Sequence, residues 1–338
     1  MDTSLLIRAP IALVPVLLFL AALVHSDSYK LVPMRTVLGL VAAGALGAGV
    51  SYVLNVYFYA QFAGNFAAYS RLISPWIEEA LKAALLLYLI RTRRVGLPVD
   101  AGIAGFAIGT GFALIENLYY LASRSDNAIA IQVIRGFGTA IMHGGTATVL
   151  AMISVTLYER RPNGGLYLFL PGFLAAVAIH SGFNYLLVKP VVAALAILLV
   201  LPTIIYAVFH HTERSLRDWL DEDLDSKVQL LELINSGTFL NSNAGRMLQT
   251  LRGRFRGEDL ADMLCLLRLH GELAVRAKGV LLLRESGLDE PPLDQETRDK
   301  LEELGQLERS IGRTGMLAMR PLMMATGKDI WQLRLLGR

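Results

Sequence analysis

The sequence predicts an all-α, polytopic membrane protein of about seven transmembrane helices with a C-terminal α-helical cytoplasmic domain. Composition, charge distribution and the length of the apolar runs lead to this fold class. Of the 338 residues, 54% are hydrophobic, which is more than a soluble domain of this size usually carries. Residues 1–209 contain 13 Lys and Arg and 8 Asp and Glu, whereas residues 210–338 contain 19 and 21. We therefore expect a transmembrane domain at 1–209 and a soluble helical domain at 210–338.

Seven apolar runs are long enough to cross a bilayer, which takes about 20 residues of helix. They are residues 10–25, 36–60, 72–90, 101–122, 128–157, 166–187 and 190–209. A helix is the expected conformation because it satisfies its own backbone hydrogen bonds within lipid.

The first run is short, and Val24-His-Ser26 has the character of a signal-peptidase site. The segment before this run contains Arg8 as its basic residue, offset by Asp2, which is weak for a signal peptide. We therefore expect residues 1–26 to remain as an uncleaved anchor.

Basic residues between the runs predict the orientation of the chain. If seven helices alternate, the connections that carry Lys30 and Arg35, Arg91 to Arg94, and Arg160 and Arg161 all fall on one side. Loops rich in Lys and Arg stay in the cytoplasm. We expect a multi-pass protein of the plasma (inner) membrane, with the N-terminus outside and the C-terminal domain in the cytoplasm.

The C-terminal region shows helical apolar spacing at 212–236, 257–285 and 296–320, with a break at Asp289-Glu-Pro-Pro292. The net charge of +3 gives no reason to expect a nucleic-acid partner. The single cysteine, Cys265, excludes an internal disulfide and a cysteine-rich metal site.

The third apolar run contains Trp76-Ile-Glu-Glu-Ala-Leu-Lys82, where a spanning helix normally carries only hydrocarbon. Each such charge costs roughly 2.5–3.5 kcal/mol at the bilayer centre, so these residues are expected to have a function and to pair with another polar group. Lys82 lies four residues after Glu78 and three after Glu79, so either pair can meet on one face. One carboxylate can then act as a general base on water while the other is paired. A structural ion pair and a step on an ion pathway are the alternatives.

The charged group in the third run is one polar island, that is, a cluster of polar residues within an apolar run. The fourth run contains a second one, Phe112-x-x-x-Glu116-Asn117-x-x-Tyr120. Glu116 could position water, bind a metal or hydrogen-bond the base, and Asn117 and Tyr120 could support it. The alternative for Asn117 and Tyr120 is a hydrogen bond between helices, which membrane bundles commonly use.

The fifth and sixth runs each contain a histidine on a polar face. Arg135 and His143 share a face of one helix, and His180 and Asn184 are one turn apart on the next. Imidazole can ligate a metal or stabilise an oxyanion, and a carboxamide can donate to that oxyanion. Packing is the alternative for both histidines, and Arg135 is expected to pair with an acid.

The islands lie at similar depth in the predicted topology. At 1.5 Å per residue, the paired glutamates lie roughly 10–12 Å below the outer end of the third helix. Glu116 and His180 lie about 9–10 Å below the outer ends of theirs. We therefore expect one polar site in the outer half of the bilayer.

The four motifs in this order, each on its own predicted helix, resemble those of the PrsW family of intramembrane proteases, which is related to the CAAX prenyl-protease and Abi group. The resemblance covers roughly residues 70–188. It implies hydrolysis of a peptide bond in or near the membrane. The substrates it implies are membrane-anchored regulatory proteins, such as anti-sigma factors, cut on their outer side.

The resemblance implies a site with Glu78 and Glu79 at the centre and Glu116, His143 and His180 around them. With the motifs above, the expected catalytic residues are Glu78, Glu79, Glu116, His143, His180 and Asn184, supported by Lys82, Asn117, Tyr120 and Arg135. Members of the wider group are regarded either as metalloproteases or as glutamate-dependent enzymes without metal. If a divalent metal such as zinc is used, Glu79, Glu116, His143 and His180 are the expected ligands. The sequence has these ligand types but no HExxH motif.

Two other classes of function are alternatives to a protease. A proton- or cation-coupled transporter would use the buried acids and histidines as a relay. A membrane scaffold would act through its C-terminal domain. Transporters often show inverted repeats, and the chain shows no internal repeat, so the protease is the preferred hypothesis.

Overall fold

The computed structural model describes residues 3–123, 129–161, 164–185, 190–323 and 327–336, and these residues contain no β-strand. The chain divides into two compact units, Met1–Glu213 and Arg214–Arg338. The all-α fold class is therefore confirmed for the described residues.

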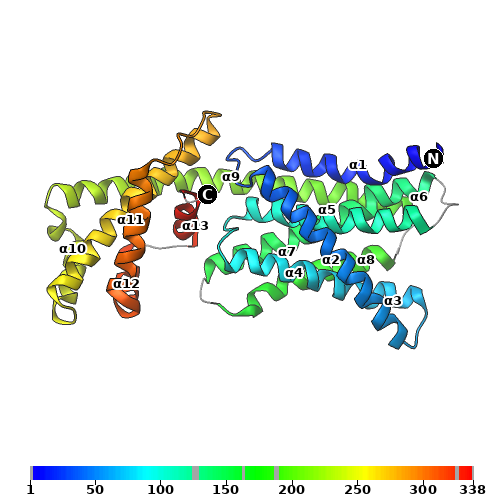
Figure 1. Ribbon diagram of the computed structural model, residues 1–338, viewed down its shortest axis with the longest axis horizontal. Coiled ribbons are helices and arrows are strands. Elements are labelled where there is room, and N and C mark those ends of the chain that lie inside the picture. The colour runs from blue at the N-terminus through cyan, green and yellow to red at the C-terminus, as the bar shows by residue number, and fades with distance from the viewer. Residues whose placement is uncertain (1–2, 124–128, 162–163, 186–189, 324–326, 337–338) are drawn as a thin grey trace. The chain divides into compact units, whose positions relative to one another are not determined.

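The first unit is a bundle of long helices that run mainly along one axis, with α2 crossing them obliquely (Figure 1). Its elements are α1 (Thr3–His25), α2 (Met34–Gln61), α3 (Phe66–Leu72), α4 (Ser74–Arg91), α5 (Pro98–Ser123), α6 (Ile129–Ile134), the π-helix η1 (Arg135–Thr139), α7 (Ala140–Arg160), the 3₁₀ helix η2 (Leu166–Phe169), α8 (Leu170–Tyr185) and α9 (Pro190–Asn235). The helix α9 passes the boundary between the units.

Six of the helices that the structure describes are long and apolar enough to cross a membrane. They contain the segments Ile7–His25, Met34–Gln61, Pro98–Ser123, Gln132–Arg160, Leu166–Tyr185 and Ala194–Asn235. The remaining predicted span, 72–90, is the 18-residue helix α4. It is about 27 Å long but carries four charged residues. The predicted span ends at 128 and 187 lie outside the described residues.

The centre of the first unit is α5, which packs against α1, α2 and α7. Glycines allow the closest approaches. A Cβ atom added at Gly109 would lie 2.2 Å from the His143 carbonyl oxygen of α7, and one at Gly44 would lie 2.1 Å from the Ile108 oxygen. Gly109 and Gly44 therefore allow close helix packing, a usual role of small residues in membrane bundles.

The basic connections of the first unit gather at one end of the bundle. The Arg93 guanidinium, just after α4, lies 4.7 Å from the ring centre of Tyr158 near the end of α7. The backbone N–H of Ser28, between α1 and α2, donates to Glu213 of α9 at 3.2 Å. Because α4 begins at the opposite end, its first turns lie far from these basic connections (Figure 1).

The second unit has its own apolar core, built around α11 (Gly257–Glu285) and α12 (Gln295–Met323). The remaining elements are η3 (Phe239–Asn241), α10 (Asn243–Thr250), η4 (Leu251–Gly253) and α13 (Gly327–Leu336). The predicted helices at 257–285 and 296–320 are present, and the predicted break falls between α11 and α12. Gly312 interrupts α12 with a φ of 68°, a conformation that glycine adopts without strain.

Two predictions about elements differ from the structure. The segments 190–209 and 212–236 form the single helix α9, because no helix-breaking residue separates them. The fifth span is not one regular helix, since η1 interrupts it and the Ala140 N–H bonds back to the Arg135 carbonyl. Single-turn π segments of this kind occur frequently at functional sites.

Candidate active site

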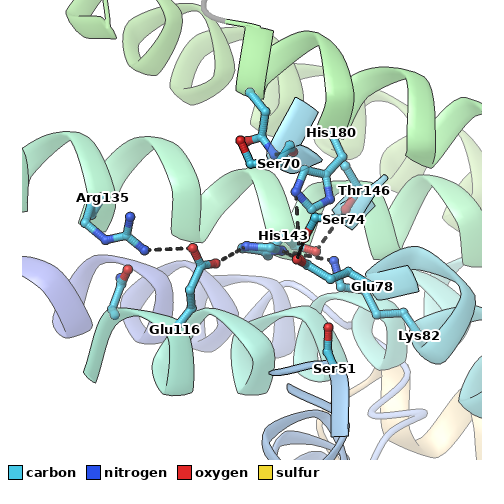
Figure 2. A network of polar contacts seen from close by, with 12 residues as sticks. Ser51, Ser70, Ser74, Glu78, Lys82, Glu116, Arg135, His143, Thr146 and His180 are labelled. Carbon is cyan, nitrogen blue, oxygen red and sulfur yellow. Dashed lines mark hydrogen bonds and ion pairs between the residues drawn. The ribbon is translucent and has the colours of Figure 1, made fainter. Parts of the chain in front are cut away.

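Four helices of the first unit bring their polar residues to one place (Figure 2). The residues are Glu78, Glu79 and Lys82 from α4, Glu116 from α5, His143 and Thr146 from α7, and His180 from α8. The prediction that the separate islands meet is therefore confirmed in the geometry, while the role of each residue remains a proposal.

Glu79 is fully buried and is hydrogen-bonded by three different helices. Its Oε1 atom accepts from Lys82 Nζ at 2.7 Å, lies 2.8 Å from His180 Nδ1, and accepts from Thr146 Oγ1 at 3.1 Å. Its other oxygen, Oε2, has no hydrogen-bond partner among the described residues. Because Lys82 is also fully buried, the two charges compensate each other inside the bundle.

Glu116 holds the second histidine in the same way. Its Oε2 atom lies 2.6 Å from His143 Nε2, and its Oε1 atom accepts from the Arg135 guanidinium at 2.9 Å. The guanidinium in turn lies over the Tyr120 ring, 3.6 Å from its centre. The predicted pairing of Arg135 with an acid is present, and Tyr120 supports that pair.

These contacts fix the tautomers of both imidazoles. An ionised carboxylate can only accept hydrogen bonds, so His180 donates from Nδ1 to Glu79 and His143 donates from Nε2 to Glu116. The other ring nitrogens, His180 Nε2 and His143 Nδ1, then carry lone pairs. His143 Nδ1 accepts from Lys82 Nζ at 3.0 Å.

Both lone-pair nitrogens face Glu78. Glu78 Oε2 lies 3.8 Å from His180 Nε2 and 4.0 Å from His143 Nδ1. Its other oxygen accepts from Ser74 Oγ at 2.7 Å, which fixes the carboxylate. The Glu78 side chain is 18% exposed, whereas that of Glu79 is 0% exposed. Of the two adjacent glutamates, Glu78 is therefore the one that is accessible from outside the bundle.

Glu78, His143 and His180 could hold a metal ion, because one ligand atom from each lies within 4.8 Å of the others. This set differs from the predicted ligands, since Glu79 and Glu116 contact the outer nitrogens of the histidines instead. Such carboxylate–histidine pairs are the usual outer support of a metal site. The residues therefore fit a divalent cation, which would take the place of Lys82 at His143 Nδ1.

A cavity of about 840 Å³ adjoins the cluster. Glu78, Glu116, His143 and His180 lie in its wall, together with residues of α2, α3 and η1. Aromatic side chains form much of the remainder, namely Tyr52, Tyr59, Phe66, Tyr69, Phe112, Tyr119, Tyr120 and Phe183. Pockets that bind ligands typically combine such an apolar lining with a few fixed polar groups.

The two predicted asparagines have different positions. Asn184 lines the cavity, and its amide donates to the Ser70 carbonyl of α3 at 2.9 Å. Asn117 is directed toward α1, where its amide donates to the Ala12 carbonyl at 2.8 Å. Asn117 thus makes the hydrogen bond between helices that was its alternative role.

Sequence reasoning missed two residues that position the cluster, Ser74 and Thr146. Ser74 lies one turn before Glu78, and Thr146 one turn after His143. Their helical spacing is a visible signal, but serine and threonine are common in membrane helices, so spacing alone does not single them out.

Comparison with known proteins identifies the family. The family described as PrsW family intramembrane metalloprotease matches residues 32–209, which is more than half of the chain. A search of curated proteins and a search of solved structures each found no match. The matched segment contains the whole polar cluster and the helices that carry it. The chain therefore belongs to the PrsW family of intramembrane metalloproteases and is a multi-pass, membrane-embedded protease that acts on membrane proteins.

Proposed function

We propose that this protease cleaves membrane-anchored regulatory proteins, similar to anti-sigma factors, near the outer face of the plasma membrane, with Glu78 at its catalytic centre. One observation carries the proposal. Glu78 is fixed by Ser74 in the wall of the cavity and faces two histidines whose outer nitrogens are each held by another carboxylate. Glu79, the other candidate, is buried behind this centre.

The proposed roles follow from the atoms that face the cavity. Glu78 Oε2 accepts the proton of the attacking water and passes it to the leaving nitrogen as the peptide bond breaks. Glu79 and Glu116 keep the lone pairs of His180 and His143 directed at the reacting centre. Lys82 balances the charge of Glu79 in the apolar interior.

If a divalent metal such as zinc is bound, Glu78, His143 and His180 would hold it, and Glu78 would then be a ligand instead of the proton acceptor, while Glu79 and Glu116 orient the two histidines. A bound metal supplies Lewis-acid polarisation of the substrate carbonyl and acidifies water. The fit is favoured because both histidines present lone pairs, and a lone pair binds a cation but cannot donate to an oxyanion. Asn184 would then be the amide that donates to the substrate.

The orientation of the chain is also part of the proposal. The basic connections lie at one end of the bundle, which the positive-inside rule assigns to the cytoplasm. Glu78 follows the start of α4, at the opposite end, by four residues, or about 6 Å. This arrangement supports the proposal that the site lies in the outer half of the bilayer and the N-terminus outside, with the catalytic domain at 1–209 and a cytoplasmic domain at 210–338.

The test compares membrane proteomes of cells that contain the wild-type protein, Glu78→Gln or Glu302→Gln. Glu302 is exposed on α12 and provides a matched control for loss of one carboxylate. We expect new termini at the outer ends of single-span proteins with the wild type and the control but not with Glu78→Gln. If Glu78→Gln is inserted normally and produces the same fragments, Glu78 is not the catalytic carboxylate. Treating the purified protein with a chelator and then restoring zinc tests the metal separately.

A further inference from the structure

One face of α2 forms a wall of the cavity but has no part in the proposed chemistry. Ala48, Ser51, Asn55 and Tyr59 lie on this face and line the cavity. Their spacing along α2 covers three turns, or about 16 Å. The cavity therefore extends over about 16 Å of α2.

Asn55 presents a fixed carboxamide on this wall. Its Nδ2 atom donates to Ser51 Oγ at 3.0 Å, and its Oδ1 atom accepts from the Tyr69 hydroxyl at 2.9 Å. Tyr69 is only 2% exposed, so the hydroxyl is itself held in place. These two bonds leave one N–H and one oxygen lone pair of the amide for a molecule in the cavity.

The short helix α3 supports this arrangement. Its first turn is capped by Asn65, which accepts from the Ala68 N–H at 2.9 Å. The ring of Tyr69 packs edge-on against Tyr59 of α2 with 5.2 Å between ring centres. The next residue, Ser70, accepts from the Asn184 amide. Two consecutive residues of α3 thus hold two carboxamides, one from α2 and one from α8, and both line the cavity.

The size of the cavity indicates what these amides contact. The cavity has a volume of about 840 Å³, and its wall along α2 is about 16 Å long. An extended chain rises about 3.3 Å per residue, so about five residues cover the same length. The backbone of such a chain needs hydrogen-bond partners in an apolar setting.

We propose that Asn55 binds the backbone of the unwound substrate segment as it lies along α2 toward Glu78. The inference rests on the proposed protease function and extends it to how the substrate is held. The free N–H of the amide donates to a substrate carbonyl, and its oxygen accepts from a substrate N–H. Ser51 and Tyr69 are positioning residues, because they fix the amide plane and act through Asn55.

The test measures binding without cleavage, so it is independent of whether a natural substrate is known. The probes are two synthetic peptides of 24 residues, on the scale of one membrane span, composed of leucine and alanine with lysine at both ends and carrying a fluorescent dye. One has a central Gly-Pro pair that unwinds the helix, and the other has no break. Each is titrated into lipid nanodiscs that contain full-length Glu78→Gln protein, alone or combined with a second substitution.

We expect Asn55→Leu to weaken binding of the Gly-Pro peptide about tenfold, equivalent to about 1.4 kcal/mol, and to leave the uniform peptide unaffected. Val53→Leu, at an exposed position of α2 outside the cavity wall, should change neither. Tyr69→Phe keeps the ring and removes the hydroxyl, so it should weaken the Gly-Pro peptide about threefold. It carries the same test if Asn55→Leu does not insert.

A further set of Gly-Pro peptides replaces one central backbone amide at a time with an ester. These peptides distinguish binding of the substrate backbone by Asn55 from a purely structural role of Asn55. One ester should weaken binding to the protein that keeps Asn55 but cause no further loss in Asn55→Leu, as expected for two groups that contact each other. The proposal is overturned if Asn55→Leu binds both peptides like its parent, if it loses both equally, or if every ester loss persists in it. Cleavage in the proteome test is a separate result, so failure of the protease proposal would be recognised independently.

Discussion

The close contact between α5 and α7 at Gly109 predicts how the active site responds to a single methyl group. An alanine Cβ at this position would lie 2.2 Å from the His143 carbonyl oxygen and 2.6 Å from the Gly144 Cα. Both atoms belong to the backbone, so no change of rotamer can relieve the contact. Real Cβ atoms essentially never approach closer than 3.0 Å, so Gly109→Ala must move α5 and α7 apart by about 0.8 Å.

This displacement acts directly on the proposed catalytic centre. Glu116 of α5 holds His143 of α7 through a contact of 2.6 Å, and a shift of this size takes the contact to about 3.4 Å, beyond an ordinary hydrogen bond. Misplacement of about 1 Å can cost about 100-fold in rate. We therefore expect Gly109→Ala to lower the cleavage rate by about 100-fold. Overpacking should also lower the free energy of unfolding by about 1–3 kcal/mol.

Gly102→Ala on the same helix is the matched control. There the added Cβ would meet only the flexible Met152 side chain, at 3.5 Å, which is ordinary van der Waals contact. Alanine is a better helix former than glycine by roughly 1 kcal/mol, so this variant should retain activity and be at least as stable. The assays are the cleavage rate of the membrane protein identified in the proteome comparison and the melting temperature in detergent. The reasoning is refuted if Gly109→Ala cleaves within about threefold of Gly102→Ala and melts at the same temperature.

Three further outcomes follow from the contacts described. Lys82→Met leaves the Glu79 charge buried without its cation, so it should lower the free energy of unfolding by about 3–5 kcal/mol. The double variant Lys82→Met with Glu79→Gln should recover much of the lost melting temperature. If the melting temperature does not recover, the two residues are not coupled. Glu116→Gln should weaken zinc binding about 10–100-fold through His143, measured by calorimetry on the purified protein, and unchanged affinity would exclude Glu116 as the orienting group. Burial raises the pKa of Asp27, between α1 and α2, from 3.8 to about 6, so its ionised form destabilises the folded state increasingly between pH 4 and 6 and fully above it. Asp27→Asn should therefore raise the free energy of unfolding at pH 8 by up to about 3 kcal/mol, seen as a higher melting temperature, with little gain at pH 4. An equal gain at both pH values would contradict this assignment.

Much of the fold could be predicted from the sequence, because apolar length and charge distribution act locally. The runs at 36–60 and 101–122 correspond to α2 and α5, since a long apolar segment in a bilayer has few alternatives to a helix. The four polar motifs also predicted that acids and histidines meet. A charge within such a run requires a partner, and the predicted depths matched across the helices.

Periodicity could not determine the rotation of each helix about its own axis. Glu78 and Glu79 are adjacent, so their side chains differ by about 100° around α4. The packing of α4 against α7 and α8 decides that Glu79 is buried beside Lys82 and that Glu78 faces the cavity. For the same reason the sequence did not exclude Glu79 as a metal ligand.

The sequence by itself determined the class of protein, its membrane-spanning runs and the residue types at its centre, because hydrophobicity and motif spacing are properties of the chain. Only the tertiary structure decided which nitrogen of each histidine faces Glu78, that Asn117 bonds to α1, and that Asn55 and Asn184 are both held by α3. These contacts join residues that lie 14 to 114 positions apart in the chain. Their geometry depends on how whole helices pack, and no local pattern records it.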